Sequence, residues 1–352
     1  MKKIRLLSLA LCLALILGML TGCGSTEEPA PAEKPVAKEE AAPSQDASEP
    51  EFVLKAGHVL SETGAYHIGL QAMSDYMYEK SGGRIMLEIY PSSQLGNERE
   101  LFEGTQLGTV DIACGATSVL SNFDPSFTIF ELPYLFDDRD HAFAVLDSEF
   151  GQSKLAALEQ YDMVGLCYYD TGFFEVINSN RPVNSLADAK GLQIRTVESA
   201  TFLATMESLG INPNPMAWTD AYVAMQNGTI DGTCNPIGPI YNTGVYEICQ
   251  NLCIAEAIYD PICVVISKAT WDSLPADLQE IVREAAAESV KVEREVNVGN
   301  EQALLEEMQS KGLKVTYVDK AEYKAATESV YEQFVPSIVS QEDIDAVRAV
   351  SK

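Results

Sequence analysis

The sequence predicts an α/β fold from two stretches in which apolar strands alternate with segments of helical spacing. The first stretch covers Phe52 to Gly115, and its order of strand, helix, strand, helix and strand is typical of one half of a doubly wound sheet. The second stretch covers Gly191 to Pro236 and repeats that order. The 352 residues are enough for one large domain or two ordinary ones.

In the first stretch, the apolar runs and their alternation predict three strands, at Phe52–Val59, Ile85–Tyr90 and Val110–Gly115. Two helices are expected between them, one over Tyr66–Ser81 and one that ends at Leu107. Short connections of this kind favour strands that lie side by side in one sheet.

The second stretch contains the best candidates for a binding site. It predicts a strand that ends at Arg195, a helix over Ser199–Leu209, a short strand in the turn Asn212–Pro215, a helix over Thr219–Asn227 and a strand that ends near Asn235. Ligands of α/β sheets bind beyond the carboxyl ends of the strands, so we expect Arg195 and Asn235 to be neighbours. Arginine offers planar, two-pronged recognition of a carboxylate, whereas this stretch contains no nucleophile beside a base.

The remaining elements are less regular. Further strands are expected at Val164–Tyr169, Phe173–Asn178, Cys263–Ile266 and Leu313–Val318, with mostly helical sequence at Asp140–Tyr161 and a last helix at Ala321–Val335. A long helical segment covers Ala276–Lys311, with Ser273 or Leu274 as its cap. It is either one helix that spans both halves of the chain or two helices broken near Asn297–Asn300.

The formal net charge of −28 disfavours nucleic acid as a partner, because phosphate binding needs clustered lysine and arginine. High solubility is the ordinary interpretation of such acidity. An anionic ligand would have to be held by nearby groups, since surface charges beyond about 8–10 Å are screened at physiological salt.

The first 23 residues resemble the signal peptide of a bacterial lipoprotein. A basic head is followed by a short apolar run and then by Leu20-Thr21-Gly22-Cys23, which resembles a lipobox. The alternative is an ordinary signal peptide with an incidental cysteine. Residues 24–50 are rich in Ala, Pro and Glu, a composition that predicts a disordered tether. We therefore expect a protein anchored by lipid on the outer face of the cell membrane.

Six cysteines remain beyond the export signal, and none stands in a zinc-binding spacing. The simplest interpretation is that they are buried small apolar residues. A disulfide between Cys249 and Cys253 is the alternative, although it is geometrically awkward if both lie on one helix. No metal site and no cofactor are expected.

Five motifs stand in one order along nearly all of residues 52–335. They are Tyr90–Ile112 (YPSSQLGNERELFEGTQLGTVDI), Glu131–Phe136 (ELPYLF), Asn180–Arg195 (NRPVNSLADAKGLQIR), Pro215–Pro236 (PMAWTDAYVAMQNGTIDGTCNP) and Leu274–Ala286 (LPADLQEIVREAA). With them the chain resembles the substrate-binding proteins of tripartite ATP-independent periplasmic (TRAP) transporters, the dicarboxylate-type DctP family. The resemblance implies a periplasmic-binding-protein-like α/β fold of two lobes, joined by crossing hinge strands and by a long helix that spans the hinge.

By this resemblance, lobe I comprises residues 51–171 and 261–300, and lobe II comprises residues 172–260 and 301–340. The two lobes are expected to close over a small organic carboxylate. The protein would then deliver that ligand to the small and large membrane subunits of a sodium-driven transporter.

The resemblance also assigns ligand-binding residues. Arg195 occupies the position of the arginine that clamps the ligand carboxylate, and Asn235 matches the asparagine of an ENP-like element in which Cys234 replaces the acid. Trp218 matches an aromatic residue that packs on the ligand. Glu98 matches an acidic position that accepts hydrogens from ligand hydroxyl or amine groups. A helix-terminal charge is the alternative role for Glu98.

One departure from the family pattern bears on the ligand. Many members carry a second arginine in a G-x-R element, where this chain has Phe174, or Glu175 if the alignment slips by one residue. Either way a cation is missing, which favours a monocarboxylate with a branched or aromatic tail. Thr117 and Ser118 follow a strand and are further candidates for contact with the ligand.

Two other functions fit the sequence less well. An exported enzyme is disfavoured, because the chain has only three histidines and no G-x-S-x-G, H-E-x-x-H or P-loop motif. A ligand-sensing receptor, or a binding protein of an ATP-driven importer, would keep the two lobes and change the partner. The order of the motifs favours the TRAP class.

Overall fold

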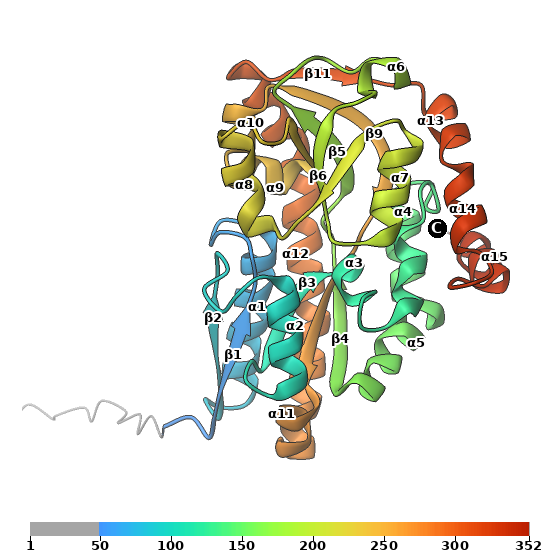
Figure 1. Cartoon of the computed structure of the whole chain (residues 1–352). Helices are drawn as coiled ribbons and strands as arrows, with labels where there is room; N and C mark the ends of the chain where they lie inside the picture. The colour runs from blue at the N-terminus through green and yellow to red at the C-terminus, as the bar shows by residue number, and fades with distance from the viewer. Residues whose placement is uncertain (1–48, 352) are drawn as a thin grey trace, which may run out of the picture. The chain divides into compact units, whose positions relative to one another are not determined.

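Two mixed β-sheets organise the part of the chain that the computed structural model describes, residues 49–351 (Figure 1). The expected signal peptide with Cys23, and the expected tether up to residue 48, lie outside these residues. The chain passes from the first sheet to the second between β4 (Met163–Tyr169) and β5 (Phe173–Asn178). It returns between β9 (Asn251–Tyr259) and β10 (Ile262–Ser267). The exact limits of the two lobes stay a prediction.

The first sheet has the strand order β2-β1-β3-β10-β4. Its first three strands are β1 (Phe52–Gly57), β2 (Ile85–Tyr90) and β3 (Ile112–Ala116), as the alternation of strands and helices predicted. β1 runs parallel to β2 and β3, whereas β10 is antiparallel to β3 and β4. The carboxyl ends of β1 and β3 therefore lie at one edge, where a ligand site is expected.

The second sheet has the order β11-β9-β5-β8-β6-β7. Its remaining strands are β6 (Gln193–Thr196), β7 (Asn212–Pro215), β8 (Gly232–Asn235) and β11 (Lys314–Tyr317). The short strand expected in the Pro/Asn turn is confirmed as β7, which pairs in parallel with β6. β6 is also parallel to β8, so the predicted strand–helix alternation brings the ends of β6, β7 and β8 to one edge.

Helices cover both sheets. In the first, α1 (Ala65–Lys80) packs on β2, α2 (Glu98–Leu107) packs on β3, and α5 (Glu149–Ala157) packs on β4. In the second, α7 (Ala200–Ser208) and α8 (Trp218–Gln226) connect the parallel strands. The shorter helical segments are α3 (Thr117–Leu120), η1 (Pro125–Glu131), α4 (Arg139–Asp147), η2 (Leu158–Tyr161), α6 (Leu186–Ala189), α9 (Ile237–Asn242), α10 (Val245–Ile248) and α11 (Lys268–Ser273).

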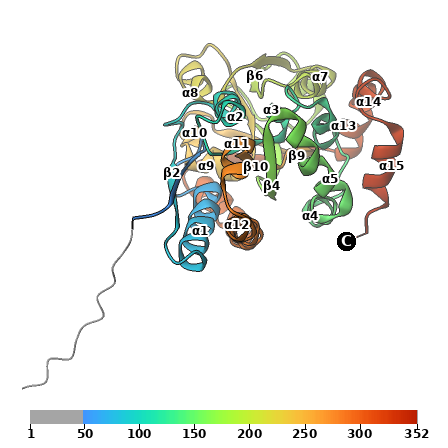
Figure 2. The ribbon, with the colours of Figure 1, turned by 90° about the horizontal axis from the view of Figure 1, so that it is seen from below.

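The long helical segment is one continuous helix, α12 (Ala276–Ser310), with no break near Asn297–Asn300. Its 35 residues correspond to about 50 Å at 1.5 Å per residue. It packs along α1 and also contacts β4 and α9, so it adjoins elements of both sheets (Figures 1 and 2). The expected cap at Ser273 or Leu274 is wrong: Ser273 ends α11, and Pro275 is the N-cap residue, with extended backbone and no side-chain cap bond.

The C-terminal region differs from the single helix expected at Ala321–Val335. Thr327 leaves helical geometry there, so the segment divides into α13 (Lys320–Ala326) and α14 (Glu328–Phe334). A further helix, α15 (Gln341–Ala349), was not predicted although Ser340 caps it and Ile344 and Val347 on it are buried. His141 on α4 bonds the carbonyl of Val347 at 3.0 Å, which ties α15 to the remainder of the fold.

The six cysteines of the folded region are free and buried, which confirms the simplest interpretation of their spacing. Cys249 follows α10 and Cys253 lies in β9, so they are not on one helix and form no disulfide. Burial raises the pKa of each of these thiols. Their role in the structure is therefore to fill apolar space.

The close contact between α1 and α12 gives a test of the fold. A Cβ atom at Gly69 would stand 2.8 Å from Glu293 Cβ and 3.0 Å from the Tyr169 ring, so Gly69→Ala should destabilise the protein by about 1–3 kcal/mol through overpacking. Gly299→Ala is the matched control, because Gly299 is exposed on α12 and a Cβ atom there would meet nothing within 4 Å. This control should stabilise the protein by about 0.5–1 kcal/mol through the better helix propensity of alanine. Urea unfolding measures both, and equal effects would contradict the packing.

Candidate ligand-binding site

A cavity lies where the edges of the two sheets face each other, and its space amounts to about 420 Å³ with the open solvent at its mouth included. On the side of the first sheet, its lining residues lie just after β1, at the first position of α2, at the end of β3 and at the start of β10. From the second it receives residues of β5, β6 and β8 and the start of α8. Its polar lining residues are Glu98, Thr171, Arg195 and Asn235, and the other ten are mainly apolar.

Arg195 is the cation of this cavity and is 3% exposed. It lies near the end of β6, and its Nε donates to the Met216 carbonyl at 3.0 Å. Its Nη1 donates to Asn235 Oδ1 at 3.5 Å, which confirms that the two predicted residues are neighbours. A guanidinium has five N–H donors, and these two bonds are its only ones within the described residues. Three donors therefore remain for a ligand.

The aromatic candidates flank this guanidinium. The Trp218 ring centroid lies 5.3 Å from Arg195 Cζ, within the range of a cation–π contact. Phe174 lines the cavity and packs edge to face on Phe202, with ring centroids 5.0 Å apart. Glu175 instead accepts the backbone N–H groups of Ala255 and Glu256 and does not line this cavity.

Glu98 is the acid of the cavity. It begins α2, and its Oε1 accepts the backbone N–H of Ala116 at 3.0 Å. Burial raises the pKa of Glu98 to about 7; the Ala116 bond opposes this shift, nearby Asp260 adds to it, and Arg195 opposes it. The carboxyl can therefore exchange a proton near neutral pH, beside the cation expected to hold a ligand.

Thr117 differs from the expectation. Its hydroxyl donates to Asp260 Oδ1 at 2.7 Å, and Thr117 is fully buried and is not among the residues that line the cavity. The neighbouring Ser118 also bonds Asp260, through its backbone N–H at 3.0 Å and its hydroxyl. Asp260 lies between β9 and β10, and α3 begins at Thr117. The two hydroxyl groups therefore bond the start of α3 to the segment that joins β9 to β10.

Sequence reasoning missed two hydroxyl groups that do line the cavity, Tyr66 and Thr171. Tyr66 lies in the first turn of α1, and Thr171 lies in the connection from β4 to β5. The expected limit between the lobes, at residues 171 and 172, marked this connection, but the sequence alone does not say which of its side chains faces a ligand.

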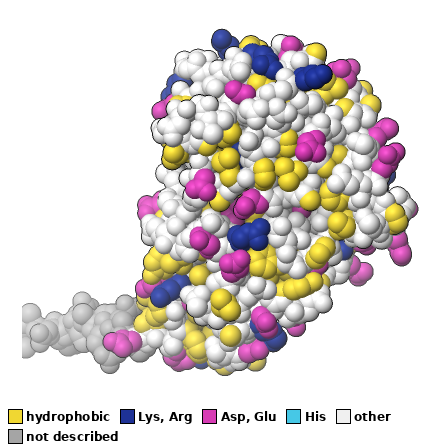
Figure 3. Space-filling view, viewed as in Figure 1, with side chains coloured by type: hydrophobic (Ala, Val, Ile, Leu, Met, Phe, Trp, Pro, Cys, Tyr) yellow, Lys and Arg dark blue, Asp and Glu magenta, His cyan; other side chains and the backbone are white. Residues whose placement is uncertain are grey.

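No second cation lines this cavity, within the described residues. Lys55 is exposed on β1, and Arg84 pairs with Glu51 and Asp277 at the surface. Arg99 lines a narrower adjoining cavity of about 290 Å³, where its Nε lies 4.0 Å from Glu198 Oε2. Acidic side chains are spread over the face shown in Figure 3, so the charge that attracts an anion here is local.

Two kinds of feature are absent from residues 49–351, the part of the chain that the structure describes. They contain no group of three or more His, Cys, Asp or Glu arranged to hold a metal ion. None of their helices combines the length and the apolar character that a membrane crossing requires.

The family profile of bacterial extracellular solute-binding proteins, family 7 (DctP), matches residues 56–337, and the chain belongs to this family. The 2,3-diketo-L-gulonate-binding periplasmic protein of Escherichia coli K12 is 30% identical, over 83% of this chain and 89% of its own. Members of the family are extracytoplasmic binding proteins for carboxylates and sugar acids, and they work with membrane subunits.

Solved structures agree with this assignment. A TRAP periplasmic solute-binding protein from Bordetella bronchispeptica, with density assigned to pantoate, has a TM-score of 0.83 and 33% identity, over 86% of this chain and 100% of that one. One from Sulfurospirillum deleyianum, with bound succinate, has a TM-score of 0.81 and 28% identity over the same shares. The predicted α/β fold of the periplasmic-binding-protein type, with its long helix, is thereby confirmed.

The raised pKa of Glu98 predicts a pH dependence of stability. Below about pH 7 the folded protein keeps a proton that the unfolded chain releases above about pH 4.3, so this group makes stability fall as pH rises through that window. Glu98→Gln should therefore raise the Tm of the ligand-free protein at pH 8 and reduce the loss of Tm between pH 5 and pH 8. Calorimetry measures this, with Glu103→Gln on the exposed part of α2 as control. An unchanged Tm difference in Glu98→Gln would contradict the assignment.

Proposed function

We propose that this protein captures a small organic carboxylate and delivers it to the membrane subunits of a sodium-coupled TRAP transporter. The observation that carries the proposal is Arg195, a buried guanidinium with three free N–H donors in a cavity between two sheets. Such a group matches a carboxylate in shape and in charge. Asn235 supports its orientation, and Trp218 covers it.

We infer that the two lobes close over the ligand. Residues of both sheets line the cavity, and the chain crosses between the sheets at two connections, of which the β4–β5 connection is bonded to α12. Hinge closure around a ligand is a common motion in proteins of this architecture. Closure would bring the Glu98 side of the cavity onto an acid already held by Arg195.

The ligand we favour is a monocarboxylate with a short branched or aromatic tail. A second carboxylate near Phe174 would lose its water without gaining a cation. An apolar tail there would gain roughly 25 cal/mol for each Å² removed from water. Pantoate has one carboxylate and a branched carbon, and it is the molecule assigned in the Bordetella relative. The succinate complex of another relative represents the competing ligand class.

A thermal-shift screen with pantoate, 3,3-dimethylbutanoate, benzoate, succinate and malate tests this function, because a ligand that binds only the native state raises its stability. Titration calorimetry on the acids that raise Tm then gives their Kd. Arg195→Ala should weaken binding roughly 30-fold or more, since removing one partner of a buried charge pair costs about 2–5 kcal/mol. Arg84→Ala, at a surface ion pair, is the matched control.

The possible outcomes separate function from ligand class. Silence of the wild type toward all five acids, or unchanged binding by Arg195→Ala, would refute the proposed function. Tight binding of succinate or malate, with the three monocarboxylates silent, would refute only the ligand class.

We also propose lipid anchoring through Cys23. The support is the order of features at the N-terminus, where a basic head and the apolar run Leu6–Met19 precede Leu20-Thr21-Gly22-Cys23. Diacylation of Cys23 would hold the protein at the outer face of the cell membrane.

Cys23→Ala should abolish labelling with radioactive palmitate and release the protein in soluble or unprocessed form. Cys12→Ala, within the apolar run, is the control and should keep the label. Labelling that survives in Cys23→Ala would show that the cysteine is incidental.

A further inference from the structure

Tyr66 and Thr171 form a buried hydroxyl pair in the wall of the larger cavity. The Tyr66 hydroxyl donates to Thr171 Oγ1 at 2.6 Å, and the two residues are 5% and 2% exposed. Burial raises the pKa of Tyr66, so the phenol keeps its proton and remains a donor. The pair comes from α1 and from the β4–β5 connection, which are far apart in sequence.

The position of this pair relative to Arg195 suggests which part of a ligand it meets. Arg195, Glu98 and Trp218 line both the larger cavity and the narrower one beside Arg99. Tyr66 and Thr171 line only the larger cavity. An acid whose carboxylate lies on Arg195 would therefore extend its tail toward the hydroxyl pair.

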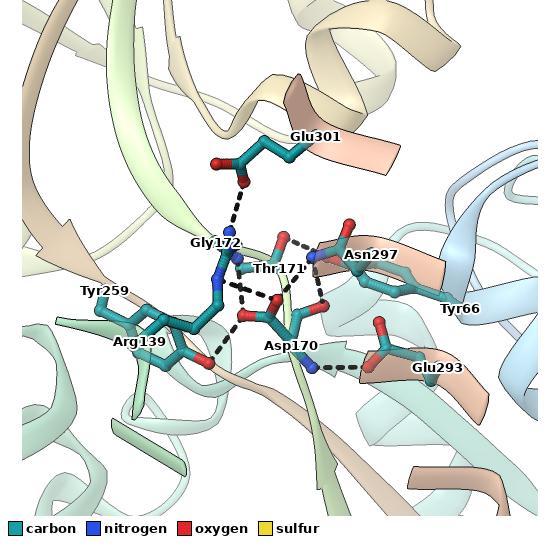
Figure 4. Close-up of polar contacts among 9 residues, drawn as sticks. All are labelled: Tyr66, Arg139, Asp170, Thr171, Gly172, Tyr259, Glu293, Asn297 and Glu301. Atoms are coloured by element: carbon teal, nitrogen blue, oxygen red, sulfur yellow. Dashed lines mark hydrogen bonds and ion pairs between the residues drawn. The ribbon is translucent and has the colours of Figure 1, made fainter. Parts of the chain in front are cut away.

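The backbone on both sides of Thr171 is held firmly by Asp170, as Figure 4 shows. The fully buried Asp170 carboxylate accepts from the Tyr259 hydroxyl at 2.8 Å, from Asn297 Nδ2 at 2.8 Å and from the Gly172 N–H at 3.0 Å. Arg139 Nε lies 3.2 Å from the same carboxylate. These bonds fix the peptide that carries Thr171.

Gly172 and Glu293 complete this support. Gly172 has φ +89°, and a Cβ atom there would meet Arg139 Nη2 at 2.6 Å, so the turn requires glycine. The Asp170 N–H donates to Glu293 Oε2 at 2.8 Å from α12. The Thr171 side chain is thus presented from a rigid backbone.

A threonine hydroxyl has one hydrogen to donate. Thr171 Oγ1 accepts from Tyr66, and the described residues show no acceptor for its own hydrogen. We propose that the Thr171 hydroxyl, oriented by Tyr66, donates to an oxygen on the tail of the bound acid and so selects hydroxy acids or keto acids over acids with a purely hydrocarbon tail. This inference rests on the proposed function and adds to it a residue that determines specificity.

The test compares acids that differ only in tail oxygens. Pantoate carries hydroxyl groups on carbons 2 and 4, 2-hydroxy-3,3-dimethylbutanoate lacks the second, and 3,3-dimethylbutanoate lacks both. Wild type should bind pantoate roughly tenfold or more tightly than 3,3-dimethylbutanoate, because one hydrogen bond contributes roughly fivefold to tenfold. Thr171→Val should lose about that factor for pantoate and leave the Kd of 3,3-dimethylbutanoate within twofold. The intermediate acid identifies the hydroxyl involved.

Three further variants make the result decisive. Thr171→Ser keeps the hydroxyl and should retain the preference for pantoate. The double variant Tyr66→Phe, Thr171→Val removes donor and acceptor together and should reproduce the loss even if the single valine variant folds poorly. Thr205→Val makes the same atomic change in α7, where the buried hydroxyl has no hydrogen-bond partner and does not line the cavity, and should change nothing.

Each outcome decides the inference. An equal preference for pantoate in wild type and in the double variant, or no preference in wild type, would overturn the role of Thr171 and leave the proposed function standing. Silence of wild type toward the whole acid panel would overturn both. Loss of the preference in Thr171→Val and in the double variant, with retention in Thr171→Ser and Thr205→Val, would support it.

Discussion

The site depends on keeping one guanidinium charged while it is buried in a strongly acidic chain. Burial lowers the pKa of Arg195 to about 10, so the group stays a cation at neutral pH, with Glu98 opposing the shift. Most of its neighbours cannot neutralise it: Met216 and Asn235 offer neutral oxygens, and Trp218 offers a ring face. A bound carboxylate would complete this arrangement. An unpaired buried charge is costly, so a ligand carboxylate on the free N–H donors would stabilise the buried Arg195.

The connection between the sheets is built differently, because it satisfies its charges internally. Asp170 accepts hydrogen bonds from α12, from β9 and from its own turn. It also forms an ion pair with Arg139 of α4, which pairs with Glu301 as well. Burial raises the pKa of Glu293 well above its usual value. A polar cluster of this kind specifies one conformation more strongly than apolar contacts do. At the binding edge Arg195 makes hydrogen bonds only to neutral oxygens, whereas at the connection Arg139 pairs with Asp170 and Glu301. This contrast fits the proposed closure of the two lobes.

Particular residues show how much of the site can be predicted from the sequence. Arg195 and Asn235 were predicted as neighbours because parallel strands end at one edge, a consequence of local periodicity. Thr117 and Thr171 both follow strands, yet only Thr171 lines the cavity. Their difference arises from Asp260, which bonds Thr117, and from Tyr66, which bonds Thr171 across 105 residues. The direction of a side chain after a strand is set by such distant partners, so it cannot be predicted from the periodicity of the local sequence. The cap of α12 was misassigned for a related reason, since Pro275 begins that helix through its backbone alone.

The six buried thiols have a practical consequence. Each has a raised pKa and a covered sulfur, so it reacts only when the surrounding structure opens. Cys114, Cys167 and Cys263 belong to the first sheet, whereas Cys234 and Cys253 belong to the second. Alkylation rates at these positions would therefore report the opening of each sheet separately. These cysteines are therefore internal probes of local opening, at strands where an attached fluorescent label would disturb the packing.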